Sequence, residues 1–376
     1  MFWIFEKKSI KQAKEVVQGA KKLLDYRRDL LAPEKVRECE LTLAELKQAI
    51  KDRKDEEIHK AVEKTEAVFG QHFPMPKHAS IRENCEVILV VIVMVVGIKA
   101  YFVQPFKIPT GSMQPTLNGV IAYPNEEEQP GGIQKAWEFI KYGRTYVNIV
   151  SEGDDNYVVH LEEKRKLPLF TYTTLVMKNG QKHTVFAPSQ VLVQQFGIRA
   201  KRVYRKGESV AKGYIDTGDQ VLVDKMSYHF VRPKRGDVFV FRTTGIKKIE
   251  QTLPPGVSSQ FYIKRLVGVG GDVLSIDPPV LTVNGVQAVE PGIARVIRSE
   301  NGYQGYSNGD ARGHQFDYLG NPGETFQLPP NTYFALGDNS YHSSDSRNWG
   351  VVEEQNVIGR GLLVYWPFTK HWGLIH

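Results

Sequence analysis

Ser112 stands in a stretch whose residue types suit a nucleophile, Gln104-Pro105-Phe106-Lys107-Ile108-Pro109-Thr110-Gly111-Ser112-Met113-Gln114-Pro115-Thr116-Leu117. Pro109 and Pro115 restrict the backbone on both sides of the serine. A serine hydroxyl held in a fixed position can attack a carbonyl carbon once a neighbouring base removes its proton. Most serines at turns only satisfy nearby backbone groups. Ser112 is therefore a candidate nucleophile, and the rest of the chain must supply the base.

A candidate base lies much later in the chain, in Phe261-Tyr262-Ile263-Lys264-Arg265-Leu266-Val267. As a strand, this stretch puts Lys264 on the same face as Tyr262 and Leu266. Burial between an aromatic and an aliphatic side chain would disfavour the ammonium form and lower the pKa of Lys264. A lysine that is neutral near neutral pH can act as a general base. The alternative is a surface lysine on an exposed strand.

A third stretch, Gly337-Asp338-Asn339-Ser340-Tyr341-His342-Ser343-Ser344-Asp345-Ser346-Arg347, gathers hydroxyl, carboxylate and guanidinium groups. His342 is a competing candidate base, because a neutral imidazole also accepts a proton near neutral pH. Four other histidines show no spacing typical of metal ligands, so we expect no metal and no cofactor; they are His183, His229, His314 and His371.

These three stretches, together with Thr217-Gly218-Asp219-Gln220-Val221-Leu222-Val223-Asp224-Lys225, resemble in type and order four motifs of the bacterial type I signal peptidases. That family (S26, leader peptidases) comprises membrane-anchored Ser/Lys-dyad serine proteases that remove signal peptides from exported proteins. Two departures stand out. Gly270 occupies a position where the family commonly has proline, and Ser340-Tyr341-His342 replaces the usual Arg-Asp-Asn. We expect Gly270 to loosen its turn slightly. Positions 340–342 are expected to support the site without taking part in the reaction, so their change should leave activity intact.

The resemblance implies a role for each matching catalytic residue. Ser112 would be the nucleophile and Lys264 the general base. The Ser112 backbone N–H and the Thr110 hydroxyl would form the oxyanion hole. The remaining implied roles support the dyad: Ser343 would hydrogen-bond to and orient the lysine amine, and Asp345 and Arg347 would form a structural ion pair near the site.

The resemblance also implies how substrate would bind. An extended substrate strand would lie beside Phe106, Ile108 and Pro109 on one side and beside Tyr262 and Ile263 on the other. Ile108 and Ile263 would help to line shallow apolar pockets. Shallow pockets admit small residues, which matches the Ala-x-Ala pattern of signal-peptide cleavage sites.

The element that would position this chemistry at a membrane is the apolar run 87–103, which only Lys99 interrupts. As a helix the run rises about 25 Å, near the lower limit for crossing a bilayer. The alternative is a buried core helix, but soluble folds seldom supply so uniform a Val/Ile run. We expect one transmembrane anchor over residues 85–103. The basic residues that precede it favour a cytoplasmic N-terminal side, so the catalytic part would be extracytoplasmic.

The remainder of the chain after the serine stretch is rich in strand and turn signals. Asn179-Gly180 and Asn284-Gly285 predict hairpins, and apart from the segment around Gln134–Lys141 little reads as helix. We therefore expect a mostly β fold: a signal-peptidase-like β catalytic domain (104–117 and 215–376, with 274–330 as its β-rich second lobe) that carries an extra, inserted β-rich subdomain (118–214). No family motif falls in the insertion, and its role is open.

Residues 1–80 predict a cytoplasmic α-helical region in which apolar residues recur at helical spacing among many charges. Pro33 is placed as the first residue of a second helix would be. A solvated helical hairpin is the favoured interpretation. The sharper alternatives are docking of an unknown partner and an interfacial membrane anchor formed by Met1-Phe2-Trp3-Ile4-Phe5.

Composition agrees with a folded, membrane-associated protein: the net charge is +7, with 41% hydrophobic and 24% charged residues. No basic stripe with interleaved aromatic residues indicates nucleic-acid binding. The two cysteines, Cys39 and Cys85, predict neither a metal site nor a disulfide.

The expected partners are signal-peptide-bearing preproteins and the lipid bilayer, and the expected location is the bacterial inner (cell) membrane, spanned once. Three alternatives remain: a specialised pilus-maturation Ser/Lys protease, a membrane-tethered binding module with a decayed protease site, and a soluble self-cleaving repressor. The apolar run argues against the repressor, and the intact set of Ser112, Lys264 and Ser343 argues against decay.

Overall fold

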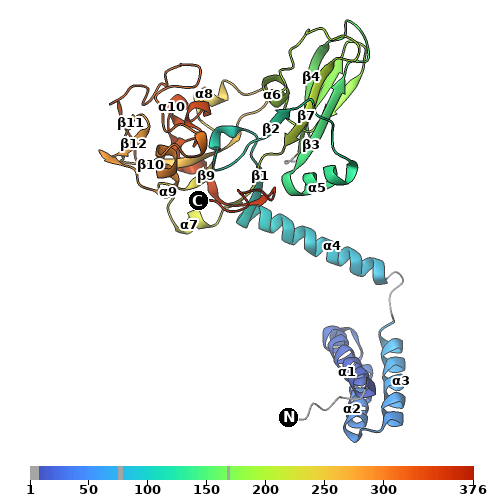
Figure 1. Ribbon diagram of the computed structural model, residues 1–376. Coiled ribbons are helices and arrows are strands. Elements are labelled where there is room, and N and C mark those ends of the chain that lie inside the picture. The colour runs from blue at the N-terminus through green and yellow to red at the C-terminus, as the bar shows by residue number, and fades with distance from the viewer. Residues whose placement is uncertain (1–7, 75–78, 167–169) are drawn as a thin grey trace, which may run out of the picture. The chain divides into compact units, whose positions relative to one another are not determined.

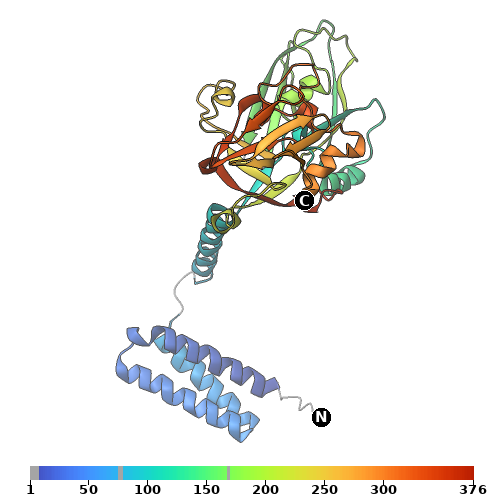
Figure 2. The same cartoon turned by 90° about the vertical axis from the view of Figure 1, so that its left-hand side faces the viewer.

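The computed structural model describes residues 8–74, 79–166 and 170–376. The chain forms two compact units, Met1–Val93 and Met94–His376, which we call unit 1 and unit 2 and describe separately. Figures 1 and 2 show helices in the first and mostly strands in the second.

Unit 1 contains three amphipathic helices, α1 (Lys8–Arg27), α2 (Pro33–Asp52) and α3 (Asp55–His72), with a short 3-10 turn η1 (Arg28–Leu30) between the first two. Pro33 occupies the first turn of α2, as predicted. Ala13, Leu46 and Ile58 pack together from the three helices. The predicted helical region is thus a three-helix unit with its own apolar core. Met1–Phe5 and the end of the segment 73–76 lie outside the described residues.

The apolar run forms α4 (Ala79–Gly97), continued by one π-helical turn, η2 (Ile98–Phe102). The span 81–102 is long and apolar enough to cross a membrane, and none of its most apolar window is buried by protein. The helix begins before the predicted residue 85, and Val103 belongs to the first strand of unit 2 and not to the helix. Hydrophobicity alone could not locate either end, since polar residues at the N-terminal end extend the helix and a β-branched residue starts the strand.

The main sheet of unit 2 has eight strands, in the order β1-β8-β17-β9-β10-β15-β16 with β18 paired to β17. Their bounds are β1 (Val103–Lys107), β8 (Gln220–Asp224), β9 (Val238–Arg242), β10 (Phe261–Val269), β15 (Thr332–Leu336), β16 (Val352–Glu353), β17 (Val357–Trp366) and β18 (Gly373–Leu374). All of its pairings are antiparallel. Valine and phenylalanine fill both faces of the central strands, so two apolar cores flank the sheet.

A smaller sheet, β13-β12-β11-β14, packs with α9 (Pro291–Ile297) around a further apolar core. Its strands are β11 (Val273–Asp277), β12 (Val280–Val283), β13 (Val286–Gln287) and β14 (Thr325–Gln327). Asn284 and Gly285 both have positive φ, as a two-residue hairpin turn requires. The hairpin predicted at this pair is confirmed.

Residues 118–214 build two further three-stranded sheets, β2-β7-β3 and β4-β5-β6. Their elements are β2 (Ile121–Pro124), α5 (Gly132–Tyr142), β3 (Arg144–Val150), β4 (Val158–Lys166), β5 (Phe170–Met177), β6 (Lys182–Val185), α6 (Ser189–Gln194) and β7 (Ser209–Asp216). The predicted hairpin at Asn179-Gly180 joins β5 to β6 and is confirmed. One apolar core, separate from those of the main sheet, holds the two sheets together.

Short helical segments complete the fold: η3 (Gly111–Met113), α7 (Ser227–Phe230), α8 (Lys247–Glu250), η4 (Glu300–Gly302), η5 (Ser340–His342), α10 (Ser346–Trp349) and η6 (Glu354–Asn356). The prediction of a mostly β fold preceded by N-terminal helices and one apolar helix is confirmed. The domain boundaries predicted from the sequence stay a proposal.

Candidate active site

Ser112 and Lys264 are in direct contact, although they belong to separate segments of unit 2. Ser112 lies in the turn η3, which follows β1, and Lys264 lies in the middle of β10. The Lys264 Nζ atom is 2.6 Å from the Ser112 Oγ atom, although 152 residues separate them in the chain. Both side chains are buried. The contact is short enough for direct proton transfer between the hydroxyl and the amine.

Burial determines the protonation of Lys264. Loss of hydration is the largest effect and lowers the pKa of Lys264 from 10.5 to about 8. The carboxylates of Asp345 and Asp338 oppose this shift, while the guanidinium of Arg347 adds to it. A substantial fraction of Lys264 is therefore neutral near pH 8, and in that state its nitrogen accepts the hydroxyl proton of Ser112.

The loop that carries Ser112 is held by the segment after β15. The Asn339 backbone N–H donates to the Ser112 carbonyl oxygen at 3.1 Å, and the Asn339 side-chain amide donates to the Gly111 carbonyl oxygen at 3.1 Å. Thr116 donates its hydroxyl hydrogen bond to Asp338. These contacts hold the loop that carries Ser112 against the segment that follows β15.

Arg265 makes the deepest charged contact beneath this loop. Its guanidinium donates to both carboxylate oxygens of Asp338, at 2.8 and 2.6 Å, and both side chains are fully buried. The Nη2 group of Arg265, one of the two that donate to Asp338, also donates to the Thr116 hydroxyl oxygen at 3.2 Å. Sequence reasoning assigned no role to Arg265, Asp338, Asn339 or Thr116. The signal was present, because Arg265 adjoins Lys264 and two of the others belong to the Gly337–Arg347 stretch, but their pairing depends on tertiary structure.

Asp345 and Arg347 form a second fully buried ion pair with two hydrogen bonds, at 2.8 and 2.7 Å. Asp345 also accepts the Gly337 backbone N–H at 3.0 Å. A side chain at Gly337 would be impossible here, because its Cβ would come within 2.1 Å of the Ser343 Oγ atom and 2.5 Å of the Ser112 carbonyl oxygen. The ion pair thus shapes the backbone directly under the serine loop.

Ser343 differs from what the sequence led us to expect, whereas His342 does not. The Ser343 hydroxyl is buried but has no hydrogen-bond partner among the residues that the structure describes, so the predicted hydrogen bond to the Lys264 amine is not formed. The His342 side chain is exposed. The groups that contact the Ser112 hydroxyl are Lys264 and, at 3.4 Å, the Thr110 hydroxyl. The geometry therefore favours Lys264 over His342 as the base.

Comparison with known proteins agrees with this geometry. Residues 183–366 match the family model described as "Signal peptidase, peptidase S26", which includes Lys264 and the Gly337–Arg347 stretch but not Ser112. A protein named signal peptidase I from Leptolyngbya laminosa is 30% identical over 182 residues, which are 48% of this chain and 76% of that protein. This chain belongs to the signal peptidase I family. It is accordingly an enzyme of a serine protease family.

Other relatives are matched over a smaller share of their own length. Signal peptidase I of Mycobacterium tuberculosis strain H37Rv is 30% identical over 42% of this chain and 60% of that protein. A probable thylakoidal processing peptidase of Arabidopsis thaliana is 31% identical over 43% of this chain and 37% of that protein. A solved structure of signal peptidase I from Enterococcus faecalis aligns at 25% identity over 35% of this chain and 97% of that chain, with a TM-score of 0.25.

Two strand edges with unpaired backbone groups lie near Ser112 and Lys264. β1 is an edge strand whose only partner in the described structure is β8. Residues Phe261 to Lys264 of β10 pair with β9, whereas β10 pairs with β15 only from Arg265 onward. The Phe106 and Phe261 rings are in edge-to-face contact, with their centroids 5.3 Å apart. The two strand edges are therefore neighbours. An extended peptide can hydrogen-bond to such edges.

The predicted substrate-contacting side chains do not all face these edges. Ile108 is buried in an apolar core, against which Phe106 and Ile263 also pack. Tyr262 packs in the other core of the sheet, and Pro109 is exposed. Because Ile108 is buried in its core, it presents little surface to a bound peptide. Sequence alternation could not separate a core position from a substrate-contacting one, because both require an apolar side chain.

Proposed function

We propose that this protein is a membrane-anchored serine endopeptidase that removes N-terminal signal peptides from exported preproteins after small residues, at Ala-x-Ala sites, with a Ser112/Lys264 dyad. The observation that carries the proposal is the 2.6 Å contact between the Lys264 amine and the Ser112 hydroxyl in a buried site that lowers the lysine pKa to about 8. Membership of the signal peptidase I family supports the substrate class.

In the first half of the reaction, neutral Lys264 takes the proton of the Ser112 hydroxyl while Oγ forms a bond to the scissile carbonyl carbon. The oxyanion that results accepts hydrogen bonds from the Ser112 backbone N–H and the Thr110 hydroxyl. Each such donor typically lowers the barrier by about 3–4 kcal/mol. When the intermediate collapses, the C–N bond breaks, and the Lys264 ammonium returns a proton to the leaving amine.

The second half hydrolyses the acyl-enzyme. Lys264, neutral again, takes a proton from water, and the hydroxide attacks the ester carbonyl carbon. When the second oxyanion collapses, the ester bond breaks and the Lys264 ammonium returns its proton to the Ser112 Oγ atom, which restores the hydroxyl and the neutral amine. Burial of the Asp345–Arg347 and Arg265–Asp338 pairs beneath the site supports this cycle, since it keeps the serine loop fixed and limits hydration of the amine.

The proposed location follows from α4 and η2. We propose that residues 81–102 cross the cell membrane once, with the residues that follow this span on the extracytoplasmic side, where cleavage sites of exported preproteins emerge. The span is long, apolar and not covered by protein, which supports this part of the proposal.

The test is cleavage of a detergent-solubilised preprotein bearing an Ala-x-Ala site by the wild type, Ser112→Ala and Lys264→Ala. We expect the wild type to cut after the second alanine and both variants to be inactive. Persistent cleavage by Lys264→Ala would assign the base to another group. Inactivity of the wild type toward several preproteins would favour a binding module, and cleavage only of pilin precursors would favour a pilus-maturation protease.

A further inference from the structure

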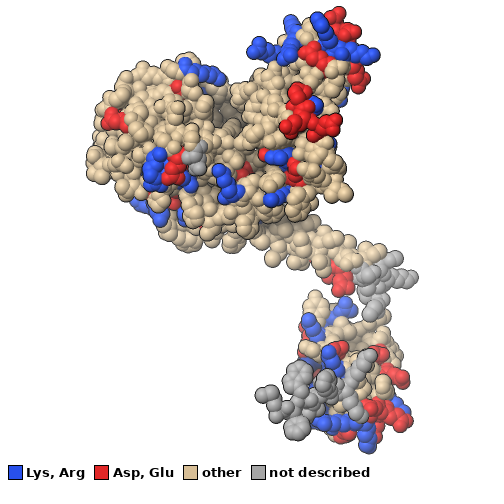
Figure 3. All heavy atoms as spheres, in the orientation of Figure 1, with Lys and Arg blue, Asp and Glu red and all other residues tan. Residues whose placement is uncertain are grey.

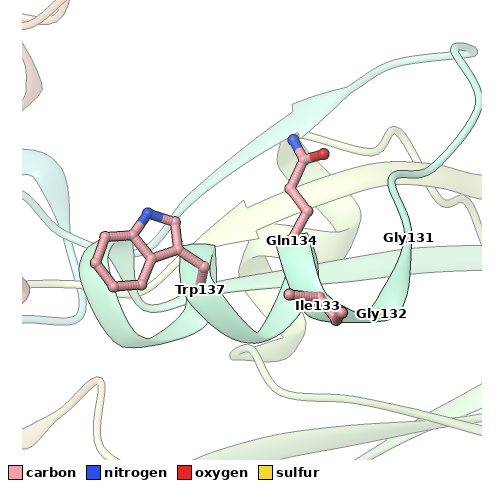
Figure 4. Close-up of a pocket in the computed structure, with 5 residues that line it drawn as sticks. All are labelled: Gly131, Gly132, Ile133, Gln134 and Trp137. Carbon is pink, nitrogen blue, oxygen red and sulfur yellow. The ribbon is translucent and has the colours of Figure 1, made fainter.

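Helix α5 of the insertion is amphipathic, but its apolar face is exposed and its polar face contacts the rest of the protein. In a soluble protein the apolar face is normally the buried one. Its apolar residues Ile133, Trp137 and Ile140 follow helical spacing i, i+4, i+7 and form one face. They are 91%, 62% and 55% exposed. Figure 4 shows Ile133 and Trp137 on the open side of the helix, where they line a shallow hollow with Gly131, Gly132 and Gln134.

The polar face of α5 is the one that contacts protein. Lys135 donates to Gln129 at 2.8 Å, and Glu138 accepts hydrogen bonds from Tyr146 and, at 3.3 Å, from Arg144. The charged side chains of Lys135 and Glu138 thus bond to the rest of the protein, while the largest apolar side chains of α5 are exposed to solvent. Exposure of the apolar face to water is unfavourable. Such a face is normally covered by another apolar phase.

The orientation of α5 is fixed and does not result from a loose helix. The Trp366 indole N–H donates to the Ile140 carbonyl oxygen at 2.7 Å, and the Phe368 backbone N–H donates to the Lys141 carbonyl oxygen at 2.8 Å. The Phe139 and Trp366 rings lie edge to face at 5.9 Å. Strand β17, which ends at Trp366, therefore locks α5 to the main sheet with its apolar face outward.

The position of the candidate membrane span within unit 2 indicates that the apolar phase next to α5 is the lipid bilayer. Unit 2 begins at Met94, within the apolar helix α4, and its residues 94–102 are the last part of the candidate span. Figures 1 and 2 both draw α5 and the C-terminus on the side of unit 2 from which this segment emerges. Phe368 and Trp372, which are exposed and in ring contact, continue the apolar surface beside α5.

Charge agrees with a lipid surface. Lys141 in the last turn of α5 and the exposed Lys370 adjoin the apolar side chains, where they suit anionic headgroups. In Figure 3 a mixed group of Lys, Arg, Asp and Glu side chains covers the far tip of the insertion, around β4 and β5.

We propose that α5 is an interfacial membrane helix, whose outward face of Ile133, Trp137 and Ile140 lies in the headgroup region of the bilayer that α4 enters. The insertion would thus give unit 2 a second membrane contact besides the span, and would restrain its rotation about residues 94–102. This inference rests on the anchoring of α4 proposed above.

The test uses the full chain in nanodiscs. Cys39 and Cys85 are replaced by alanine, and a single cysteine carrying an environment-sensitive fluorophore is introduced by Ile133→Cys, by Val193→Cys or by Val90→Cys. Val193 is the matched control, because it is an exposed apolar residue of the same insertion on α6. Val90 lies on α4 and reports anchoring independently. The quencher is a lipid with a nitroxide near the headgroup, compared with a lipid whose nitroxide lies deep in the acyl chain.

We expect the label at position 133 to be blue-shifted and quenched by the shallow nitroxide, the label at 193 to be unquenched, and the label at 90 to be quenched by the deep nitroxide. In a Trp137→Glu background the quenching at 133 should be lost, while hydrolysis of a short soluble peptide substrate stays unchanged.

Three outcomes would overturn the inference. Quenching at 90 without quenching at 133 would leave the anchor intact and remove the interfacial helix. A blue shift at 133 without lipid quenching, seen only when two chains share a disc, would assign the face to a second copy. Absence of quenching at both 90 and 133 would refute the anchoring together with the inference.

Discussion

The main sheet and the insertion of unit 2 bury different kinds of side chain. Beneath the serine loop the protein buries charged groups completely or nearly so: Lys264, Arg265, Asp338, Asp345 and Arg347. In the described part of 118–214 the core is apolar, and the buried polar side chains are the uncharged Ser151, Asn156 and Thr173. Buried charges are costly unless they are paired, whereas apolar burial is stabilising by itself. The main sheet therefore buries ionisable groups at a cost in stability, and these groups surround Ser112. The core of the insertion carries no such cost.

The largest effect on stability is expected from breaking a buried pair. Asp345→Ala would leave the Arg347 guanidinium buried without its carboxylate, and should lower the free energy of unfolding by about 3–5 kcal/mol. Equilibrium urea unfolding in detergent measures the change. The matched control is Glu300→Ala, which removes an exposed carboxylate paired with Arg298 and should cost no more than about 1 kcal/mol. Equal losses of unfolding free energy in the two variants would contradict the claim that the buried pair contributes more to stability than an exposed one.

A smaller effect, confined to catalysis, is expected at Thr110. Thr110→Val removes the hydroxyl while keeping the shape, and should lower kcat by about 10²–10³-fold with little change in KM, as loss of one oxyanion donor does. Thr110→Ser retains the hydroxyl and should keep most of the activity. Steady-state cleavage of a preprotein gives both constants. A kcat that stays at the wild-type level in Thr110→Val would remove Thr110 from the oxyanion hole.

The smallest effect is expected in the core of the insertion. Ile149→Val deletes one methylene group from a buried position on β3 and should cost about 0.5–1.5 kcal/mol of stability without altering kcat. Unfolding and steady-state kinetics on the same preparation decide the matter. A fall in kcat at unchanged folded fraction would show that the insertion is coupled to the dyad, contrary to the comparison.

Much of the fold could be predicted from local sequence because local physics determines it. Asn179-Gly180 and Asn284-Gly285 supply the positive φ angles that tight hairpins need, and the uniform Val/Ile run predicts a long apolar helix. The order of strands in the main sheet could not be predicted, since β1 pairs with β8 across the whole insertion and β17, from near the end of the described chain, lies between β8 and β9.

In the candidate site, too, some residues could be predicted from local sequence and others could not. The residue types and motif order pointed to Ser112 and Lys264, and the alternation of β10 explained why a lysine there could be buried. The contacts of Arg265 with Asp338 and Thr116 join residues 73 and 149 positions apart, which no local pattern reveals. The periodicity of α5 predicted a helix near Gln134–Lys141, but only the packing of Trp366 shows which of its faces is turned outward.

The central claim is that a neutral Lys264 is the base, and the pH dependence of kcat/KM tests it most directly. Because burial lowers the pKa of Lys264 to about 8, the neutral amine predominates above that pH. The rate should therefore rise with pH, fall about tenfold per unit below pH 8, and level off above it. The control is Lys107→Met, since burial also lowers the pKa of Lys107 but its contacts do not include Ser112; the ionisation near 8 should persist in this variant. A midpoint near 10.5, or an ionisation that disappears with Lys107, would contradict the account.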